Sequence, residues 1–91
     1  MTSPNLRKVI LRLANLQGAN LWYADLTGAY LNTANLRDAD LWGAILVGAN
    51  LSRADLHLAG LYLANLRGAK LEEAYFCNTT MPDGSINNRD C

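Results

Sequence analysis

One histidine and one of the two cysteines stand twenty residues apart in this 91-residue chain, and their side chains could do chemistry together. His57 offers an imidazole and Cys77 a thiol. These groups can form a base and nucleophile pair, or two of the ligands of a zinc ion. Either role requires the two side chains to lie side by side, so the elements that position them decide whether the pair is a site.

The chain repeats itself every five residues over most of its length. Ala recurs at each fifth position from Ala14 to Ala74, and Leu follows two residues later from Leu16 to Leu71, after which Phe76 takes the place of Leu. An α-helix turns by about 100° per residue, so a five-residue period would leave no apolar stripe along it. In an extended segment, by contrast, residues two apart point to the same face.

Each five-residue unit therefore makes one extended side and one corner. Ala and Leu point inward, and two further residues, often including Gly, turn the chain at corners that need a residue tolerant of positive φ. If each corner turns by about a right angle, four units close a square and the fifth lies on the first. The repeat thus predicts a quadrilateral β-solenoid in which residues twenty apart stack about 4.8 Å from each other.

Composition and charge exclude several classes of protein. Hydrophobic residues make up 51% of the chain, and eight Lys and Arg balance eight Asp and Glu, which argues against long-range steering of nucleic acid. No apolar run approaches the roughly 20 residues of a membrane span. The start, MTSPNLRKVI, lacks the apolar core of a signal peptide. As written, we expect a cytoplasmic protein without a membrane span.

Stacking at twenty-residue intervals puts aromatic rings in a row on one side of the square. Trp22, Trp42 and Tyr62 form this row, with Tyr23 and Leu63 at the adjoining corner. Such a ladder can stabilise neighbouring strands, or it can form an apolar patch that docks a protein partner or a second copy of the chain. No row of Lys or Arg lies beside the rings to hold a phosphate backbone, so the sequence predicts no nucleic-acid partner.

The same register stacks His57 on Cys77, with Asp55 and Tyr75 as the nearest outward groups. These are a poor set of zinc ligands, and the convex side of a solenoid offers no pocket for catalysis. No Ser, His and acid triad, phosphate-binding loop or carboxylate pair can be placed elsewhere. The sequence therefore predicts that the protein is not an enzyme and has no catalytic, cofactor-binding or metal site and no small-molecule substrate.

The units ANLQG, ADLTG, ANLRD, ADLWG, ANLSR and ANLRG share an A-(N/D)-L-x-x pattern that resembles the pentapeptide-repeat family, in particular its short cyanobacterial members. The resemblance covers residues 14–78 closely and implies an all-β, right-handed quadrilateral β-helix of about four coils. It is compatible with a non-catalytic structural or protein-interaction module of unknown specific role. Some members mimic DNA and bind DNA gyrase, a topoisomerase. That alternative is disfavoured here because Asp25, Asp40 and Asp55 fall on three different sides, which leaves no acidic face.

The repeat loses its regularity at both ends of what we expect to be a single domain over residues 1–91. Residues 14–78 hold the regular repeats, and residues 79–91 form an irregular cap that contains the turn signal PDG. Residues 1–13 are an N-terminal cap or a first coil.

Two structures are open for residues 4–13. Leu6, Val9, Ile10 and Leu13 have helical spacing, and Pro4 suits the first turn of a short helix. The five-residue frame fits as well, with Val9 standing in for Ala. The sequence favours a coil slightly and leaves the short N-terminal helix as the alternative.

Cys77 and Cys91, the only cysteines, both lie in the terminal region. A disulfide between them would close a loop of about 15 residues, stabilise the fold by up to about 3 kcal/mol and pin the cap. It would form only in an oxidising compartment. Some relatives in photosynthetic organisms reside in the thylakoid lumen or the periplasm, so these compartments are the alternative to the cytoplasm if a targeting segment has been removed.

Overall fold

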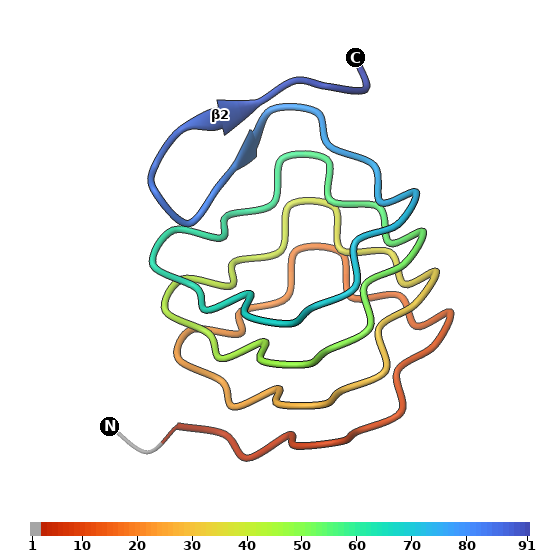
Figure 1. Ribbon diagram of the computed structural model, residues 1–91, viewed down its shortest axis with the longest axis vertical. Helices are drawn as coiled ribbons and strands as arrows, with labels where there is room; N and C mark the ends of the chain where they lie inside the picture. The colour runs from red at the N-terminus through yellow and green to blue at the C-terminus, as the bar shows by residue number, and fades with distance from the viewer. Residues whose placement is uncertain (1–2) are drawn as a thin grey trace.

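The computed structural model describes residues 3–91, which wind into a solenoid of stacked coils (Figure 1). Parallel β-bridges join residues twenty positions apart, from Asn5 with Asp25 at one end to Gly60 with Thr80 at the other. The coils stack along the longest axis of the molecule, which measures 34 Å against 25 and 24 Å across. The structure thus has the twenty-residue register that the repeat predicts.

Each side of a coil pairs with the coils before and after it through alternating backbone groups. The N–H of Asp25 donates to the carbonyl oxygen of Pro4 at 2.9 Å, and its own carbonyl accepts from the N–H of Leu6 at 2.8 Å, so both groups of Asp25 face the preceding coil. The flanking Leu26 instead donates to Ile45 of the following coil at 2.7 Å. A side therefore holds one bridging residue between an Ala and a Leu, which is too short for a regular strand.

Ala and Leu fill the interior in continuous rows. The side chains of every row Leu from Leu26 to Leu61 have no exposed area, and every row Ala from Ala24 to Ala59 is at most 1% exposed. Full burial of a Leu contributes about 1.5 to 3 kcal/mol relative to an exposed one. The small Ala beside it lets the opposite walls of the narrow coil approach each other.

The corners explain why Asn or Asp follows Ala in the repeat. The Oδ1 of Asn50 accepts from the N–H of Ser52 at 3.0 Å, and the Oδ1 of Asp40 accepts from the N–H of Trp42 at 3.2 Å. Such bonds from a short side chain to the backbone two residues on stabilise a turn. Asn or Asp is thus preferred at the bridging position because its side chain stabilises the turn that the chain makes two residues later.

A residue with positive φ ends each corner, as expected, but Gly is not the usual choice. Gly18, Gly28, Gly43, Gly48 and Gly68 supply some corners. All the other corners from residue 8 to residue 78 use residues with a Cβ, at φ between 49° and 64°. These are Lys8, Leu13, Tyr23, Thr33, Asp38, Arg53, Leu58, Leu63, Glu73 and Asn78.

Residues 4–13 form part of the first coil rather than a helix. Ile10 bridges to Tyr30, and the N–H of Leu11 donates to the carbonyl oxygen of Tyr30 at 2.8 Å. Pairing with the next coil satisfies these backbone groups, whereas a helix of so few residues is marginal in water. The alternative of a short N-terminal helix is therefore wrong, and Val9 does take the place of Ala. The part of the chain from residue 3 to residue 91 contains no helix with the length and apolarity that crossing a membrane requires.

A hairpin and a short tail fold back over the C-terminal end (Figure 1). Strand β1 (Thr79–Thr80) pairs antiparallel with β2 (Ile86–Asn87), so that Thr79 lies opposite Asn87. In the tail, the carboxylate of Asp90 accepts from the N–H of Phe76 at 2.8 Å, and the guanidinium of Arg89 lies 4.8 Å from the centre of the Phe76 ring.

Candidate functional site

The structure brings the aromatic residues together on one side of the solenoid. We call Trp22, Tyr23, Trp42, Tyr62 and Leu63 the aromatic side. Backbone bonds hold its register, because the N–H of Tyr23 donates to the carbonyl oxygen of Trp42 at 2.9 Å. The N–H of the next corner residue, Gly43, donates in the same way to Tyr62 at 2.9 Å.

The rings touch one another along this side. The centroids of Trp22 and Trp42 are 4.6 Å apart at an angle of 65°, and those of Trp42 and Tyr62 are 6.2 Å apart and nearly parallel, at 12°. Tyr23 lies 6.1 Å from Trp42 and extends over Gly43, where an added Cβ would lie 2.6 Å from its ring. Contacts between these rings thus stabilise the packing of neighbouring coils.

A substantial part of the aromatic side remains in contact with solvent. The exposed fraction is 37% for Trp22, 43% for Tyr62 and 57% for Leu63. Trp and Tyr are the residue types that contribute most often to the energy of protein interfaces. The arrangement can therefore present an apolar surface to another protein.

The two indole N–H groups have different surroundings. Nε1 of Trp22 donates to Oδ2 of Asp40, which lies on the next coil. Nε1 of Trp42 is buried and has no hydrogen-bond partner within residues 3–91. The position that holds Asp40 beside Trp22 holds Gly60 beside Trp42, because Asp40 and Gly60 are bridged neighbours on successive coils. Gly60 has no side chain to accept a hydrogen bond from the indole of Trp42. Asp40 is thus a neighbour of the aromatic side that the sequence did not point to, although its diagonal position follows from the twenty-residue register.

Asp40 accepts a bond from Trp22, and Asp83 adjoins Gly84, whose Cβ position lies 3.4 Å from the ring of Tyr62. No Lys or Arg occurs in the stretches 20–23, 40–43 and 60–63. Two hydrogen bonds from Ser85, one from its hydroxyl at 2.6 Å and one from its N–H at 2.9 Å, lower the pKa of the Asp83 carboxyl below its ordinary value. Asp83 is therefore ionised throughout the physiological pH range.

His57 and Cys77 have different surroundings in the structure. Cys77 is buried and joined in a disulfide to Cys91, with 5.3 Å between the Cα atoms, a usual separation for a bridge. Nδ1 of His57 is buried and has no partner in the described structure, and its ring lies 6.4 Å from that of Tyr75. Across residues 3–91, no three His, Cys, Asp or Glu side chains group so as to hold a metal ion.

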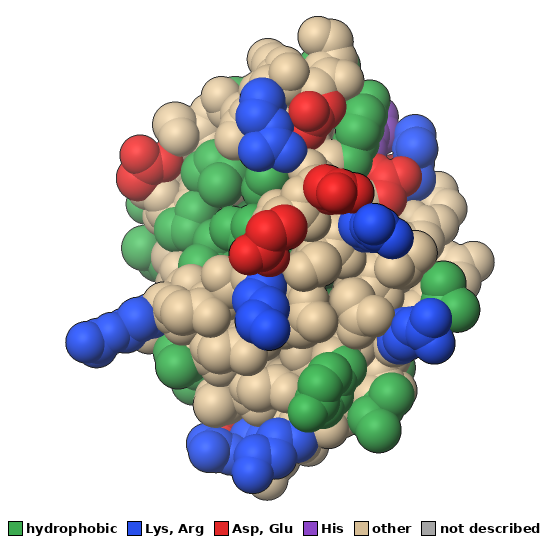
Figure 2. Space-filling model, turned by 45° about the vertical axis from the view of Figure 1, so that its right-hand side comes forward, with side chains coloured by type: hydrophobic (Ala, Val, Ile, Leu, Met, Phe, Trp, Pro, Cys, Tyr) green, Lys and Arg blue, Asp and Glu red, His purple; other side chains and the backbone are tan. Residues whose placement is uncertain are grey.

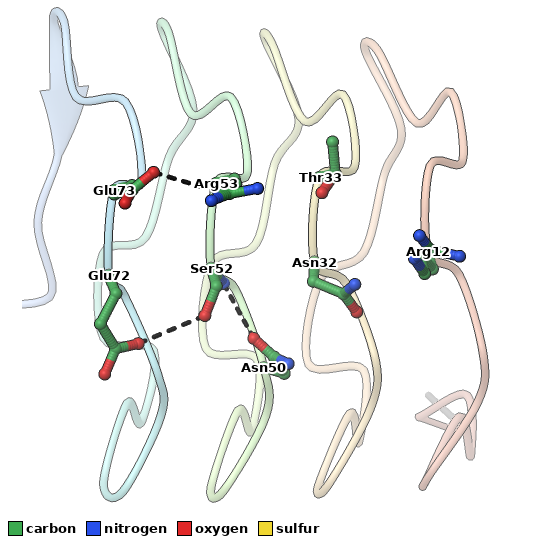
Figure 3. A pocket seen from close by; sticks show the side chains of 8 residues that line it. All are labelled: Arg12, Asn32, Thr33, Asn50, Ser52, Arg53, Glu72 and Glu73. Carbon is green, nitrogen blue, oxygen red and sulfur yellow. Dashed lines mark hydrogen bonds and ion pairs between the residues drawn. The ribbon is translucent and has the colours of Figure 1, made fainter.

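An open polar hollow of about 380 Å³ lies on another side, along the ladder of Arg12, Asn32, Ser52 and Glu72 (Figure 3). Its carboxylates are already engaged. The hydroxyl of Ser52 donates to Glu72 at 3.2 Å, and Nε of Arg53 donates to Glu73 at 3.0 Å. One oxygen of each carboxylate in the hollow therefore accepts a hydrogen bond from a neighbouring donor.

The chain is similar to known repeat proteins over nearly its whole length. The family model described as pentapeptide repeats matches residues 2–32, 34–72 and 59–87. Among solved structures, HetL from the cyanobacterium Nostoc sp. Strain PCC 7120, a pentapeptide repeat protein involved in heterocyst differentiation regulation, is 38% identical with a TM-score of 0.57. A pentapeptide repeat protein of the Arabidopsis thaliana thylakoid lumen is 30% identical with a TM-score of 0.82.

Each of these two matches covers 91% of this chain, but only 40% of HetL and 58% of the Arabidopsis protein. The chain thus spans about half the length of these relatives. A search among curated proteins gave no match. These likenesses establish the fold class but do not identify a partner. A partner therefore has to be inferred from the residues on the surface.

Proposed function

We propose that this chain, which belongs to the pentapeptide repeat family, is a non-catalytic interaction module that docks a protein partner or a second copy of itself through the aromatic side. The observation that carries the proposal is the contiguous row of Trp22, Trp42 and Tyr62, in which Trp22 and Tyr62 are exposed and Trp42 is half-buried, flanked by the exposed Tyr23 and Leu63. A module of this kind needs a rigid surface, which the buried rows of Ala and Leu supply.

The proposed module is one domain over residues 1–91. In it, residues 3–13 begin the first coil, residues 14–78 are the regular repeats, and residues 79–91 are the cap, and the whole solenoid has about four coils, while residues 1 and 2 lie outside the described part of the chain. The cap contributes to the surface, since the Cβ position of Gly84 lies 3.4 Å from the ring of Tyr62.

Sedimentation across a concentration series tests the self-docking form of the proposal. The test variant carries Trp22→Ser, Tyr62→Ser and Leu63→Ser, and leaves Trp42 in place because its ring packs between neighbours. The matched control carries Ile45→Ser and Leu58→Ser, two exposed apolar residues on other sides. If the wild type and the control associate and the folded test variant does not, the aromatic side is an interface.

Monomers in all three samples would exclude self-docking and leave a different protein as the partner. Thermal melts followed by circular dichroism then separate docking from a purely structural ladder. A docking surface predicts that Leu63→Ser alone leaves the melting temperature nearly unchanged, because Leu63 is 57% exposed. A large loss of stability would show that the side serves the fold and would contradict the proposal.

We further propose an oxidising compartment for this module. The separation of Cys77 and Cys91 supports it, as does the likeness to a protein of the thylakoid lumen. A count of free thiols in protein purified without reductant and then denatured tests this. Two free thiols would contradict it.

A further inference from the structure

Within residues 3–91, the first coil of the solenoid has backbone groups that lack a backbone partner. In the inner coils, each bridging residue turns its N–H and its carbonyl towards the preceding coil, as Asp25 does towards Pro4 and Leu6. The bridging residues of the first coil are Asn5, Ile10, Asn15 and Asn20. Neither the N–H nor the carbonyl of any of these four has a backbone partner within residues 3–91. We call these backbone groups the first-coil edge.

The interior is also less covered at this end. Leu6, Leu11 and Leu16 are only partly buried, whereas their counterparts one coil further on have no exposed area. Ile10, beside them, is 77% exposed. A row of unpaired backbone groups next to partly covered Leu side chains is a template on which an extended segment can add.

The positive charge of the first coil indicates which kind of segment would bind to its edge. Arg7, Lys8 and Arg12 lie in the first coil, and no Asp or Glu precedes Asp25 in the sequence. Figure 2 shows Lys and Arg side chains gathered at the lower end of the molecule, where Figure 1 places the N-terminus. Arg7 pairs with Asp25 at 3.4 Å, while Lys8 and Arg12 form no ion pair in the described part of the chain.

We propose that the first-coil edge along residues 5–13 binds an extended, acidic protein segment, which adds by β-bridging as a further side of the solenoid. Its N–H groups donate to the carbonyls of Asn5 and Ile10, and its carbonyls accept from their N–H groups. Apolar residues of the segment cover Leu6 and Leu11, and its carboxylates face Lys8 and Arg12. A second copy meeting the edge with its own first coil is disfavoured, because like charges would oppose each other.

The edge can be blocked without removing an internal hydrogen bond. Ile10→Pro deletes an N–H that has no backbone partner within residues 3–91, and Pro is one of the residues that protect natural sheet edges. The equivalent change one coil further on, Tyr30→Pro, would delete the bond from Tyr30 to the carbonyl of Val9 at 2.9 Å. We therefore expect Ile10→Pro to keep the wild-type melting temperature and Tyr30→Pro to lower it.

The probes are two fluorescently labelled peptides, one with two Ala-Asp-Leu-Glu-Gly units and one with two Ala-Asn-Leu-Lys-Gly units. Fluorescence anisotropy with wild-type protein should show binding of the acidic peptide at least about tenfold tighter than that of the basic one, weakening as salt is raised. Amide shifts in NMR spectra should concentrate in residues 5–13. The Ile10→Pro variant should lose this binding.

A charge variant keeps the test valid if Ile10→Pro does not fold. Lys8→Glu with Arg12→Glu should weaken acidic-peptide binding about tenfold or more, while Arg67→Glu with Lys70→Glu, at the far end of the same two sides, should not. Absence of binding at millimolar peptide, equal binding of the two peptides, or full binding by Ile10→Pro would each overturn the proposal. Self-association of the wild type that Ile10→Pro abolishes would also overturn it, because the occupant would then be a second copy. None of these outcomes depends on the aromatic side.

Discussion

At the scale of single residues, a comparison of Gly43 with Gly48 separates the cost of a positive φ from the cost of overpacking. Both adopt a φ of 68°, but an added Cβ at Gly43 would lie 2.6 Å from the ring of Tyr23, whereas no atom lies within 4 Å of that position at Gly48. We expect Gly43→Ala to lower the free energy of unfolding by about 1 to 3 kcal/mol more than Gly48→Ala does, because of overpacking. Urea denaturation measures the difference.

Removing the ring tests the cause. In a Tyr23→Ala background, Gly43→Ala should have the same effect as Gly48→Ala, which is about 1 to 2 kcal/mol for placing an L residue at positive φ. Equal urea midpoints for the two alanine variants with Tyr23 present would show that the ring moves aside without cost and would contradict the expectation.

Thr33 is a corner where Gly would be favourable but a β-branched residue stands instead. Its backbone adopts a φ of 61° at an exposed position. A left-handed backbone costs a residue with a Cβ about 1 to 2 kcal/mol, and more for a branched one. Gly removes this strain, while its greater freedom in the unfolded chain offsets up to about 1 kcal/mol. We expect Thr33→Gly to raise the free energy of unfolding by up to about 1 kcal/mol, and Asn32→Gly, one residue before the strained position, to lower it. A lower urea midpoint for Thr33→Gly would contradict this account.

At the scale of elements, the C-terminal tail should loosen in acid. Hydrogen bonds from Arg89 and from the N–H of Phe76, with the positive charge of Arg89, lower the pKa of the Asp90 carboxyl. Because the folded pKa lies below the unfolded one, the stability that Asp90 contributes is present above the unfolded pKa and is lost as the pH falls through the folded pKa.

Asp90→Asn measures this contribution. We expect the wild type to unfold at higher urea than Asp90→Asn at pH 7, and the difference to shrink below about pH 4. Asp25 and Asp83, whose carboxyl pKa values are also lowered by hydrogen bonds, remain in both proteins and form a common background. The control, Asp38→Asn, removes a carboxylate that accepts no hydrogen bond within residues 3–91. A constant difference from pH 7 to pH 3 would show that Asp90 does not hold the tail through its charge.

Some elements could be predicted from the sequence and others could not, for physical reasons. The rows from Leu26 to Leu61 were predictable because only an extended five-residue unit turns Ala and Leu the same way. The corner residues were not, because burial and pairing of the sides override the local cost of a positive φ at Leu58 or Thr33. The C-terminal tail is held by bonds from Phe76 to Asp90 and from Arg89 to Ala74 that no repeat encodes. In the aromatic side, the row itself followed from the register, whereas the overlap of Tyr23 with Gly43 required coordinates.

At the scale of the whole molecule, two periods act independently. The five-residue frame decides which side chains enter the interior, and the twenty-residue turn decides which outward side chains stack. Stability of such a solenoid is approximately a sum over its coils and their contacts. Removing residues in multiples of five should therefore preserve folding, while only a multiple of twenty should preserve the ladders.

Three deletions test this separation. Removing residues 35–54 joins Ala34 to Asp55 and leaves Tyr62 directly above Trp22, twenty positions on. Removing residues 35–49 also keeps the frame but moves Tyr62 to a neighbouring side, and removing residues 35–52 breaks the frame. We expect the first two proteins to fold cooperatively and the third not to fold, as judged by circular dichroism and urea denaturation. The denaturant dependence of the first should fall by about a fifth, the share of the chain removed. If the aromatic side docks a partner, only the first deletion retains that activity, and equal activity in the second would show that stacking of the rings is not what the partner recognises.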